Sequence, residues 1–471
     1  WRQRLFVLIR HDRRAQAEPV VVDHGVPPRH CLAPVRKNSM NLSRFALAAA
    51  ALGSSLSATP VFAQAESTLL EPAIPAGFDR GRNTSVTDRA RPDYDPVGIP
   101  VGGFNLFPRL DVGVGVTDNV FFNPAEKKTD GFTTIAPRVQ LNSDWNRNTL
   151  QFRGGANLER YFNETRRNQN AWDLGALGRY ELGSSMAVTA EAQLARLYET
   201  PFSGAISSDI AVLSNYLRNY LSLRGQYQAG QSRLTLAVDH TGFDFSGITL
   251  ASGAKLSQED RDRTIDRIVG QAEYAFSPAM ALYGQLSYGQ INYSRNLLNG
   301  QPNRDSDAWR LIGGATFDLT SLIRGQLGIG YVWRNFDSPV YRNVSGLSVE
   351  GRVEYFPTEL ATITLQVSRL IEDSSIGANS AFFNNQVSAQ VDYEVLTNFI
   401  LTGLGQYARQ DFIDSPVSAD IYRLGIQGRY LSSRRVNLRG GITYVKRSSA
   451  DIALGSDTNE LRGLLTLTIQ R

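Results

Sequence analysis

Residues 107–118 read FPRLDVGVGVTD, and the second half of this stretch sets the pattern for most of the chain. Apolar side chains stand at every second position from Leu110 to Val116 and alternate with aspartate and glycine. Successive side chains of a β-strand point to opposite faces, so a period of two indicates a strand with one apolar and one polar face.

The same alternation recurs along the chain to its end. Further strands are predicted near 135–145, 150–159, 171–182, 186–198, 213–227, 233–244, 264–276, 280–293, 307–319, 323–334, 346–356, 360–371, 385–395, 399–409, 421–431, 436–446 and 458–470. Most of these runs match or exceed the ~9–11 residues of a tilted bilayer crossing, whereas strands of soluble sandwiches average ~5–6. The sequence therefore predicts an all-β fold, a transmembrane antiparallel up-and-down β-barrel of about 18 strands.

The connections between these strands support the same architecture. Short turns such as 146–148, 183–185 and 432–435 alternate with longer polar loops such as 119–130 and 246–263. Outer-membrane barrels show this asymmetry, with short periplasmic turns and long external loops.

The first 106 residues have a different composition. Around Met40, Arg44 precedes the apolar run 45–52 and an Ala-x-Ala site at 63–65, which is typical of a secretory signal peptide. We therefore expect residues 1–39 to be an upstream non-native or untranslated-derived segment and residues 40–65 to be the signal peptide. A proline-rich stretch without periodicity follows, so 66–106 is predicted to be a flexible periplasmic segment and 107–471 the barrel.

These boundaries change the charge of the chain. The formal net charge of +4 becomes about −2 from residue 66 onward, because the upstream stretch is strongly basic. The apparent basicity therefore gives no reason to expect nucleic-acid binding. Cys31, the only cysteine, also precedes this point, which excludes a disulfide or a zinc-thiolate site in the barrel. We expect no cofactor and no metal.

Charged residues fall on the polar parity, and aromatic residues gather near strand ends on the apolar parity. Arginine at the bilayer midplane costs ~2–4 kcal/mol, so the charged set must face a watery lumen. The predicted lumen-lining residues are Arg138, Arg153, Arg179, Arg218, Arg224, Arg310, Arg324, Arg352, Arg429, Glu159, Glu191, Glu350 and Glu354. The predicted aromatic girdle at the headgroup layers comprises Trp145, Trp172, Trp309, Trp333, Tyr180, Tyr198, Tyr288 and Tyr407. Paired charges could hold the wall in register or select solutes, and both roles stay open.

The opening of the barrel carries more specific motifs. A strand ending in Thr-Asp-Asn-Val (117–120) is followed by Lys-Thr-Asp-Gly (128–131), Ala-Pro-Arg (136–138) and a Trp-Asn-Arg turn (145–147). This run resembles the start of the "putative beta-barrel porin 2" family of Gram-negative outer-membrane proteins. The resemblance implies a barrel in the outer membrane without catalytic residues to carry over, in a family that often accompanies exopolysaccharide or capsule export.

An enzymatic barrel is the competing class. His240 is the only histidine after the signal peptide, and its parity with Leu234, Leu236 and Val238 places it on the lipid-facing rim. Glu350 and Glu354 share the lumen face, but Arg352 stands between them, so a charge ladder explains them as well as a catalytic pair does. We expect no enzymatic activity and no catalytic residue.

We therefore expect an outer-membrane channel that conducts or assists export of exopolysaccharide or capsular polysaccharide. The alternatives are a general diffusion porin, or a closed structural barrel that partners an envelope export complex. Expected partners are outer-membrane lipid, the barrel-assembly machinery, polysaccharide and envelope export proteins, and no nucleic acid. The parity further predicts that arginine at Ile329 impairs insertion, whereas arginine at Gly328 is tolerated.

Overall fold

The computed structural model describes residues 77–199, 210–250, 253–320, 322–374, 380–413, 418–449 and 457–471. The predicted upstream segment and signal peptide lie outside the described residues. No helix in the described ranges is long and apolar enough to cross a membrane.

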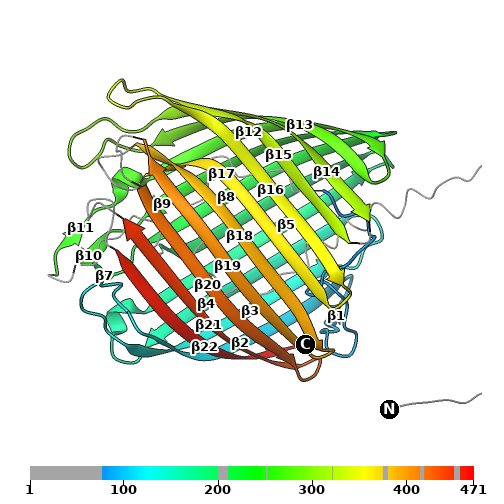
Figure 1. Cartoon of the computed structure of the whole chain (residues 1–471), viewed down its shortest axis with the longest axis horizontal. Helices are drawn as coiled ribbons and strands as arrows, with labels where there is room; N and C mark the ends of the chain where they lie inside the picture. Colours follow the sequence, from blue (N-terminus) through cyan, green and yellow to red (C-terminus); the bar gives the residue numbers. More distant parts are fainter. Residues whose placement is uncertain are drawn as a thin grey trace, which may run out of the picture. The chain divides into compact units, whose positions relative to one another are not determined.

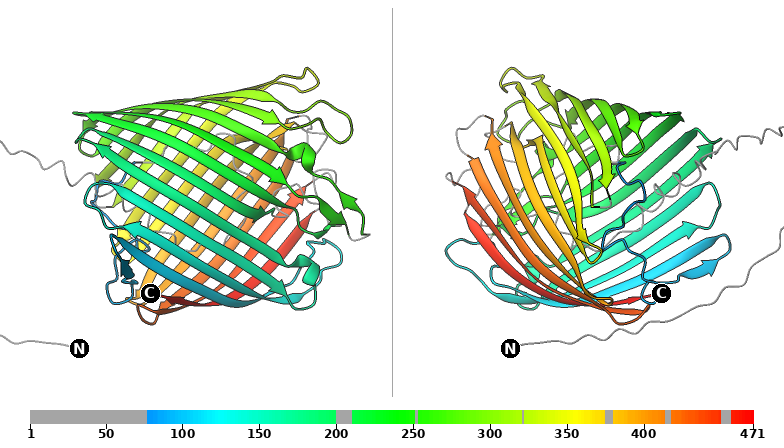
Figure 2. Two further views of the ribbon diagram at one scale, coloured as in Figure 1. Left: turned by 180° about the vertical axis from the view of Figure 1, so that it is seen from behind. Right: turned by 45° about the vertical axis from the view of Figure 1, so that its right-hand side comes forward.

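Eighteen long antiparallel strands form one closed barrel (Figures 1 and 2). They are β2 (Phe104–Thr117), β3 (Asp130–Ser143), β4 (Thr149–Tyr161), β5 (Gln169–Leu182), β6 (Met186–Tyr198), β8 (Asn215–Ala229), β9 (Ser232–Phe245), β12 (Arg263–Ser277), β13 (Met280–Tyr293), β14 (Ser306–Thr320), β15 (Ile323–Phe336), β16 (Val344–Thr358), β17 (Ala361–Asp373), β18 (Ala381–Leu396), β19 (Phe399–Phe412), β20 (Ser418–Leu431), β21 (Val436–Ser449) and β22 (Thr458–Gln470). Each strand pairs with its neighbour in the chain, and β22 pairs with β2 to close the ring. The predicted fold class and strand number are confirmed.

The closing seam is completed by a short extra strand. The β22 ladder on β2 reaches Arg109, which pairs with Gln470. Beyond it, β1 (Ile99–Val101) folds back on β2 and pairs with residues 104–106. Gly102, with a φ of 60°, occupies the connecting turn, where a left-handed conformation favours glycine. Strand β2 therefore begins at 104, three residues earlier than predicted.

The two faces of the wall differ as the alternation predicts. Leu221, Leu223, Leu234, Leu236 and Val238 on β8 and β9 are 42–56% exposed because they point outward. Their sequence neighbours point into the lumen, and Ala237 and Asp239 are almost fully buried. An apolar outer band of this kind is what a lipid bilayer requires.

The two ends of the barrel are built differently. At one end, short hairpins such as β5–β6 and β8–β9 turn on Gly183 and Gly230, both with positive φ. At the other end lie the long loops, which include β7 (Ile210–Val212), β10 (Ile248–Leu250) and β11 (Lys255–Leu256) in a sheet of their own. Two 3-10 turns, η3 (Thr165–Arg167) and η5 (Glu259–Arg261), belong to the same end. The short-turn end is the periplasmic one by the general rule for such barrels.

Residues 77–98 contain no helix or strand, yet they are packed against the barrel. Phe78 and Val86 are 6% and 0% exposed. In Figure 2 this dark blue stretch runs along the short-turn end of the barrel. The described part of the stretch that the sequence analysis expects to be flexible thus has fixed contacts with the wall.

Candidate functional site: the lumen

A buried polar network lies on the inward face of β13 to β16. The Arg310 guanidinium donates to Glu350 at 2.7 Å, and the Tyr283 hydroxyl donates to the same carboxylate at 2.8 Å. Gln326 donates to both Tyr283 and Glu350 at 3.1 Å. Arg310 is only 1% exposed. The charge of Arg310 is therefore neutralised by Glu350 within the wall. Removing either residue would leave the other without its counter-ion.

Two glycines allow this network to form. A Cβ atom at Gly328 would stand 2.3 Å from the Tyr283 hydroxyl oxygen, and one at Gly314 would stand 2.5 Å from the same ring. Tyr283 can therefore lie flat across β14 and β15 only where side chains are missing. The prediction that arginine is tolerated at Gly328 is wrong, because the inward space at this position is already occupied.

A second cluster surrounds Glu354. Arg324 and Arg352 each donate to this carboxylate at 2.7 Å. Arg352 has no ion pair with Glu350 within the described ranges, and Glu350 is bound by Arg310 instead. The inward charges of β16 thus belong to two networks. Arg352 and Glu354 pair along the strand, whereas Glu350 and Glu354 are also bound by arginines of β14 and β15.

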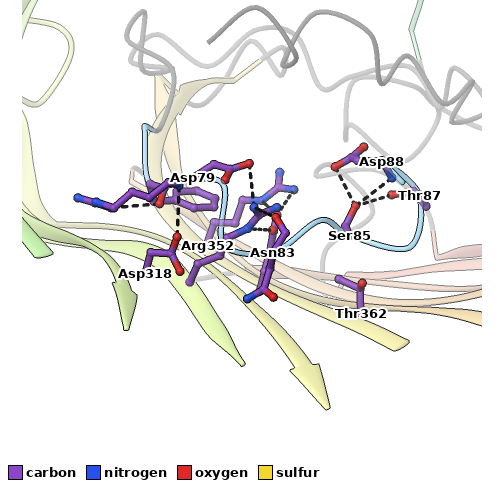
Figure 3. A network of polar contacts seen from close by, with 12 residues as sticks. Asp79, Asn83, Ser85, Thr87, Asp88, Asp318, Arg352 and Thr362 are labelled. Atoms are coloured by element: carbon purple, nitrogen blue, oxygen red, sulfur yellow. Dashed lines mark hydrogen bonds and ion pairs between the residues drawn. The ribbon is translucent and has the colours of Figure 1, made fainter. Parts of the chain in front are cut away.

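The stretch 77–98 extends the second cluster along the rim (Figure 3). Arg324 bonds the Asp79 carboxylate and the Asn83 carbonyl oxygen, both at 2.8 Å. The backbone N–H of Arg80 donates to Asp318 on β14 at 3.3 Å, and that of Val86 donates to Thr362 on β17 at 2.9 Å. Each contact joins the stretch to an inward side chain near the short-turn end.

Arginines of the stretch also reach acidic residues of the wall. Arg89 and Arg91 bind Glu394 on β18 at 3.0 and 2.7 Å. Burial holds the pKa of Arg80 below its usual value, although the nearby carboxylates of Glu273 and Asp318 act in the opposite direction. Four arginines of the stretch, at 80, 82, 89 and 91, thus contact the wall at Asp318 or Glu394.

The wall from β3 to β8 holds its charges more loosely. Arg153 and Glu191 are 3.6 Å apart, and Arg179 and Glu181 are 3.7 Å apart. Arg218 donates to Gln193 at 3.3 Å. The remaining predicted residues of this side are Arg224, which faces Thr189, and Glu159, which pairs with Arg462 of β22. Arg138 and Arg429 make neither a hydrogen bond nor an ion pair with any residue in the described ranges.

A third cluster near the external end was missed by the sequence analysis. Asp373 binds Arg334 at 2.6 Å and Arg263 at 3.2 Å, and both arginines are at most 3% exposed. The Arg263 guanidinium also stacks 4.7 Å from the Phe243 ring. Arg334 continues the inward parity of Gln326 and is the last residue of the strand predicted at 323–334, so the same parity rule would have found it.

A sequence profile described as Putative beta-barrel porin 2 matches residues 91–471. The chain belongs to this family. It is therefore an outer-membrane protein, a porin-like β-barrel channel.

Solved structures with a similar fold include two Pseudomonas aeruginosa proteins and one from Acinetobacter baumannii. OpdL of Pseudomonas aeruginosa has 12% identity and a TM-score of 0.42, over 79% of this chain and 99% of its own. OccAB4 of Acinetobacter baumannii has 11% identity and a TM-score of 0.41, with coverage of 78% and 98%. The siderophore receptor PirA of Pseudomonas aeruginosa has 10% identity and a TM-score of 0.41, with coverage of 80% and 81%. No curated protein sequence matches this chain.

Aromatic side chains of this porin-family barrel form two outward groups. Near the external end, Tyr288 packs on Trp309 with centroids 4.6 Å apart, and Trp309 stacks on Trp333 at 6.4 Å. Tyr407, Trp172 and Tyr198 lie toward the same end of their strands. Trp145, 49% exposed, and Tyr180, 56% exposed, lie at the short-turn end. The two groups thus lie toward opposite ends of the strands.

His240 lies on the outer surface, as its parity indicates. Its Nδ1 is 2.7 Å from the Asp266 carboxylate on β12, and the two side chains are 39% and 53% exposed. A lone exposed pair accounts for this histidine structurally. Among the described residues, no group of three or more histidine, cysteine, aspartate or glutamate side chains is placed to hold a metal ion.

Proposed function

We propose that this channel passes an exported polysaccharide through the outer membrane. The inward face of β3 and β4 supports this proposal. Gln140 donates to Asn142 at 2.9 Å, and Gln151 donates to Asn142 at 2.8 Å. Side-chain amides both donate and accept hydrogen bonds, as sugar hydroxyls require.

The observation that carries the proposal is that residues 77–98 cover only one side of the lumen. Their hydrogen bonds to the wall reach β14, β15, β17, β18 and the turns at 359 and 434. No hydrogen bond from this stretch reaches β3 to β8 in the part of the chain that the structure describes. The hydrophilic side opposite is thereby left facing the lumen along its length, as a path for a hydrophilic chain.

The test is an in-frame deletion of the gene in the bacterium that makes the protein. We expect extracellular polysaccharide to fall and polymer to accumulate in the periplasm, and the intact gene to reverse both. Normal polysaccharide secretion in the deletion strain would overturn the proposal. The partners that it requires are a polysaccharide and the periplasmic proteins that deliver it, in addition to lipid and the barrel-assembly machinery.

A general diffusion porin is the second candidate, and the mixed charge of the lumen favours it. In that case the deletion strain would secrete polysaccharide normally but take up small hydrophilic solutes more slowly. Reconstituted protein would conduct salt in planar bilayers under both proposals, so the conductance alone does not separate them. A closed structural barrel would give no conductance at all.

A further inference from the structure

Four arginines gather on the inward face near the short-turn end, on β20, β21, β2 and β3. Arg429 stands directly opposite Arg439, and Arg109 stands directly opposite Arg138. Only β22 separates the two pairs, and it offers Thr466 opposite Arg439. Arg109, Arg429 and Arg138 all lie within electrostatic range of Arg439. We call these four residues the arginine quartet.

This arrangement is costly for the fold. Like charges directly opposite each other on antiparallel strands destabilise the pair. Asp111 compensates part of the charge, because it binds Arg109 at 3.0 Å. Arg138 lies across Gly155 from Asp173 without an ion pair. The excess of positive charge is therefore a local property of this wall.

The charges around Arg429 have the same character. Arg91 and Arg109, as well as Asp392 and Asp95, lie within electrostatic range of Arg429. Asp392 already accepts hydrogen bonds from Gln390 and Thr402. Arg429 itself is half-buried, so its guanidinium can be reached from the lumen.

Residues 77–98 reinforce the effect on the adjacent wall, β14 to β18, and they reach the β20–β21 turn at Arg434. Arg89 and Arg91 bind Glu394. The Asp318 carboxylate accepts from the backbone N–H of Arg80, and the Arg82 guanidinium donates to the main-chain oxygen of Asp318. These contacts cover the acidic groups that would otherwise repel an anion at the same end of the lumen. The mouth on the periplasmic side is thus positive on one wall and neutralised on the other.

The chemistry of the quartet selects a class of ligand. The guanidinium fork matches carboxylate, phosphate and sulfate groups. The quartet spans four inter-strand steps, roughly 19 Å. A single small anion would contact one pair of arginines, whereas an extended polyanion can contact both pairs. Once the first pair is bound, the second contact forms within the same complex and therefore strengthens binding.

We propose that Arg109, Arg138, Arg429 and Arg439 form a binding site for an acidic polysaccharide where it enters the barrel from the periplasm. This inference rests on the proposed function and specifies its substrate as a polymer with repeated anionic groups. The site holds the first acidic sugars of the chain, and the hydrophilic wall receives the rest.

The test is the block of ionic current in planar bilayers. Polygalacturonate fragments added to the short-turn side should block the wild-type channel, whereas neutral dextran of equal length should not. The variant with R138Q and R429Q should need more than tenfold higher polygalacturonate for half-block. The matched control carries R233Q and R352Q, two inward arginines of β9 and β16 near the same end that are paired with Glu273 and Glu354, and should stay within twofold of the wild type.

Several results would overturn the inference. If polygalacturonate blocks the wild type and the R138Q and R429Q variant equally, the quartet is not a binding site. If both double variants lose block to the same extent, the effect comes from the overall positive charge of the lumen. Block by monomeric galacturonate at the same concentration would show a site for single anions. If the glutamine variant fails to fold, the variant with R138K and R429K replaces it, because lysine keeps the charge but lacks the planar fork of arginine. Unchanged block in the lysine variant would also reject recognition by the guanidinium groups. Normal secretion in the deletion strain with a positive block result would reject the export function alone.

Discussion

Two walls of the same barrel follow the same alternation of apolar and polar residues. One wall holds its inward charges in close ion pairs, whereas the other leaves them farther apart. On β13 to β16, Arg310 is 1% exposed and binds Glu350 at 2.7 Å. On β3 to β8, Arg153 is half-buried and stands 3.6 Å from Glu191. Parity decides only that both arginines point inward. The neighbouring strands decide whether the charge stabilises the wall or remains available to a solute.

The largest effect is expected from Arg310→Met. The substitution leaves the Glu350 carboxylate, 14% exposed, without its cation and should destabilise the barrel by about 3 kcal/mol. Arg153→Met on the other wall should cost no more than about 1 kcal/mol, since that pair is long and hydrated. Urea unfolding in detergent micelles, followed by heat-modifiable gel mobility, measures both. Similar costs for the two variants would show that the walls do not differ.

The outer surface should not share this asymmetry. Arginine at Ile329, behind the first wall, and at Leu223, behind the second, should each cost about 2–4 kcal/mol, because both positions face lipid. Ser222→Arg is the matched inward control, next to Leu223 and opposite Glu191 and Asp239. It should insert normally. A defect at Ser222 equal to that at Leu223 would indicate a wrong register.

A smaller effect is expected where residues 77–98 contact the wall. Glu394→Gln removes the charge that holds Arg89 and Arg91, a loss of about 1.5–3 kcal/mol to the local contact. Trypsin should then cleave after Arg89 or Arg91 about tenfold faster, as mass spectrometry of the fragments would show. Glu359→Gln is the control, because Glu359 is exposed and contacts Arg89 through its backbone oxygen only. Unchanged cleavage in Glu394→Gln would mean that other contacts hold the stretch.

The smallest effect is expected from His240→Ala. An exposed pair with Asp266 contributes at most about 1 kcal/mol, and neither side chain faces the lumen. Single-channel conductance and block by polygalacturonate should both match the wild type. A hydrolytic activity in the purified protein that disappears with this substitution would contradict the channel assignment.

The sequence was sufficient for the barrel and for the direction of most side chains. Alternation with a period of two can be recognised within each strand by itself. It therefore predicts the eighteen strands and the inward direction of both Arg310 and Glu350. Pairing across strands is not local. That Arg352 binds Glu354 while Glu350 binds Arg310 depends on the register of β14, β15 and β16.

The close approach at Gly328 could not be read from the sequence either, because its cause is Tyr283 on another strand. The same holds for residues 77–98. They lack apolar periodicity, and the partners that order them lie far away in the chain, 238 residues away for Arg80 and Asp318 and 303 for Arg91 and Glu394. Composition indicates only that such a stretch has no core of its own.

The seam between β2 and β22 also determines when the barrel can form. Thr468 reaches Asp111 across a separation of 357 residues, so the pairing of β2 with β22 has a higher entropic cost of loop closure than the pairing of strands that are neighbours in the chain. Until β22 is in place, β2 has an open edge, and β1 covers only its first three residues. A nascent barrel therefore exposes the unpaired edge of β2 as its aggregation-prone surface until β22 covers it.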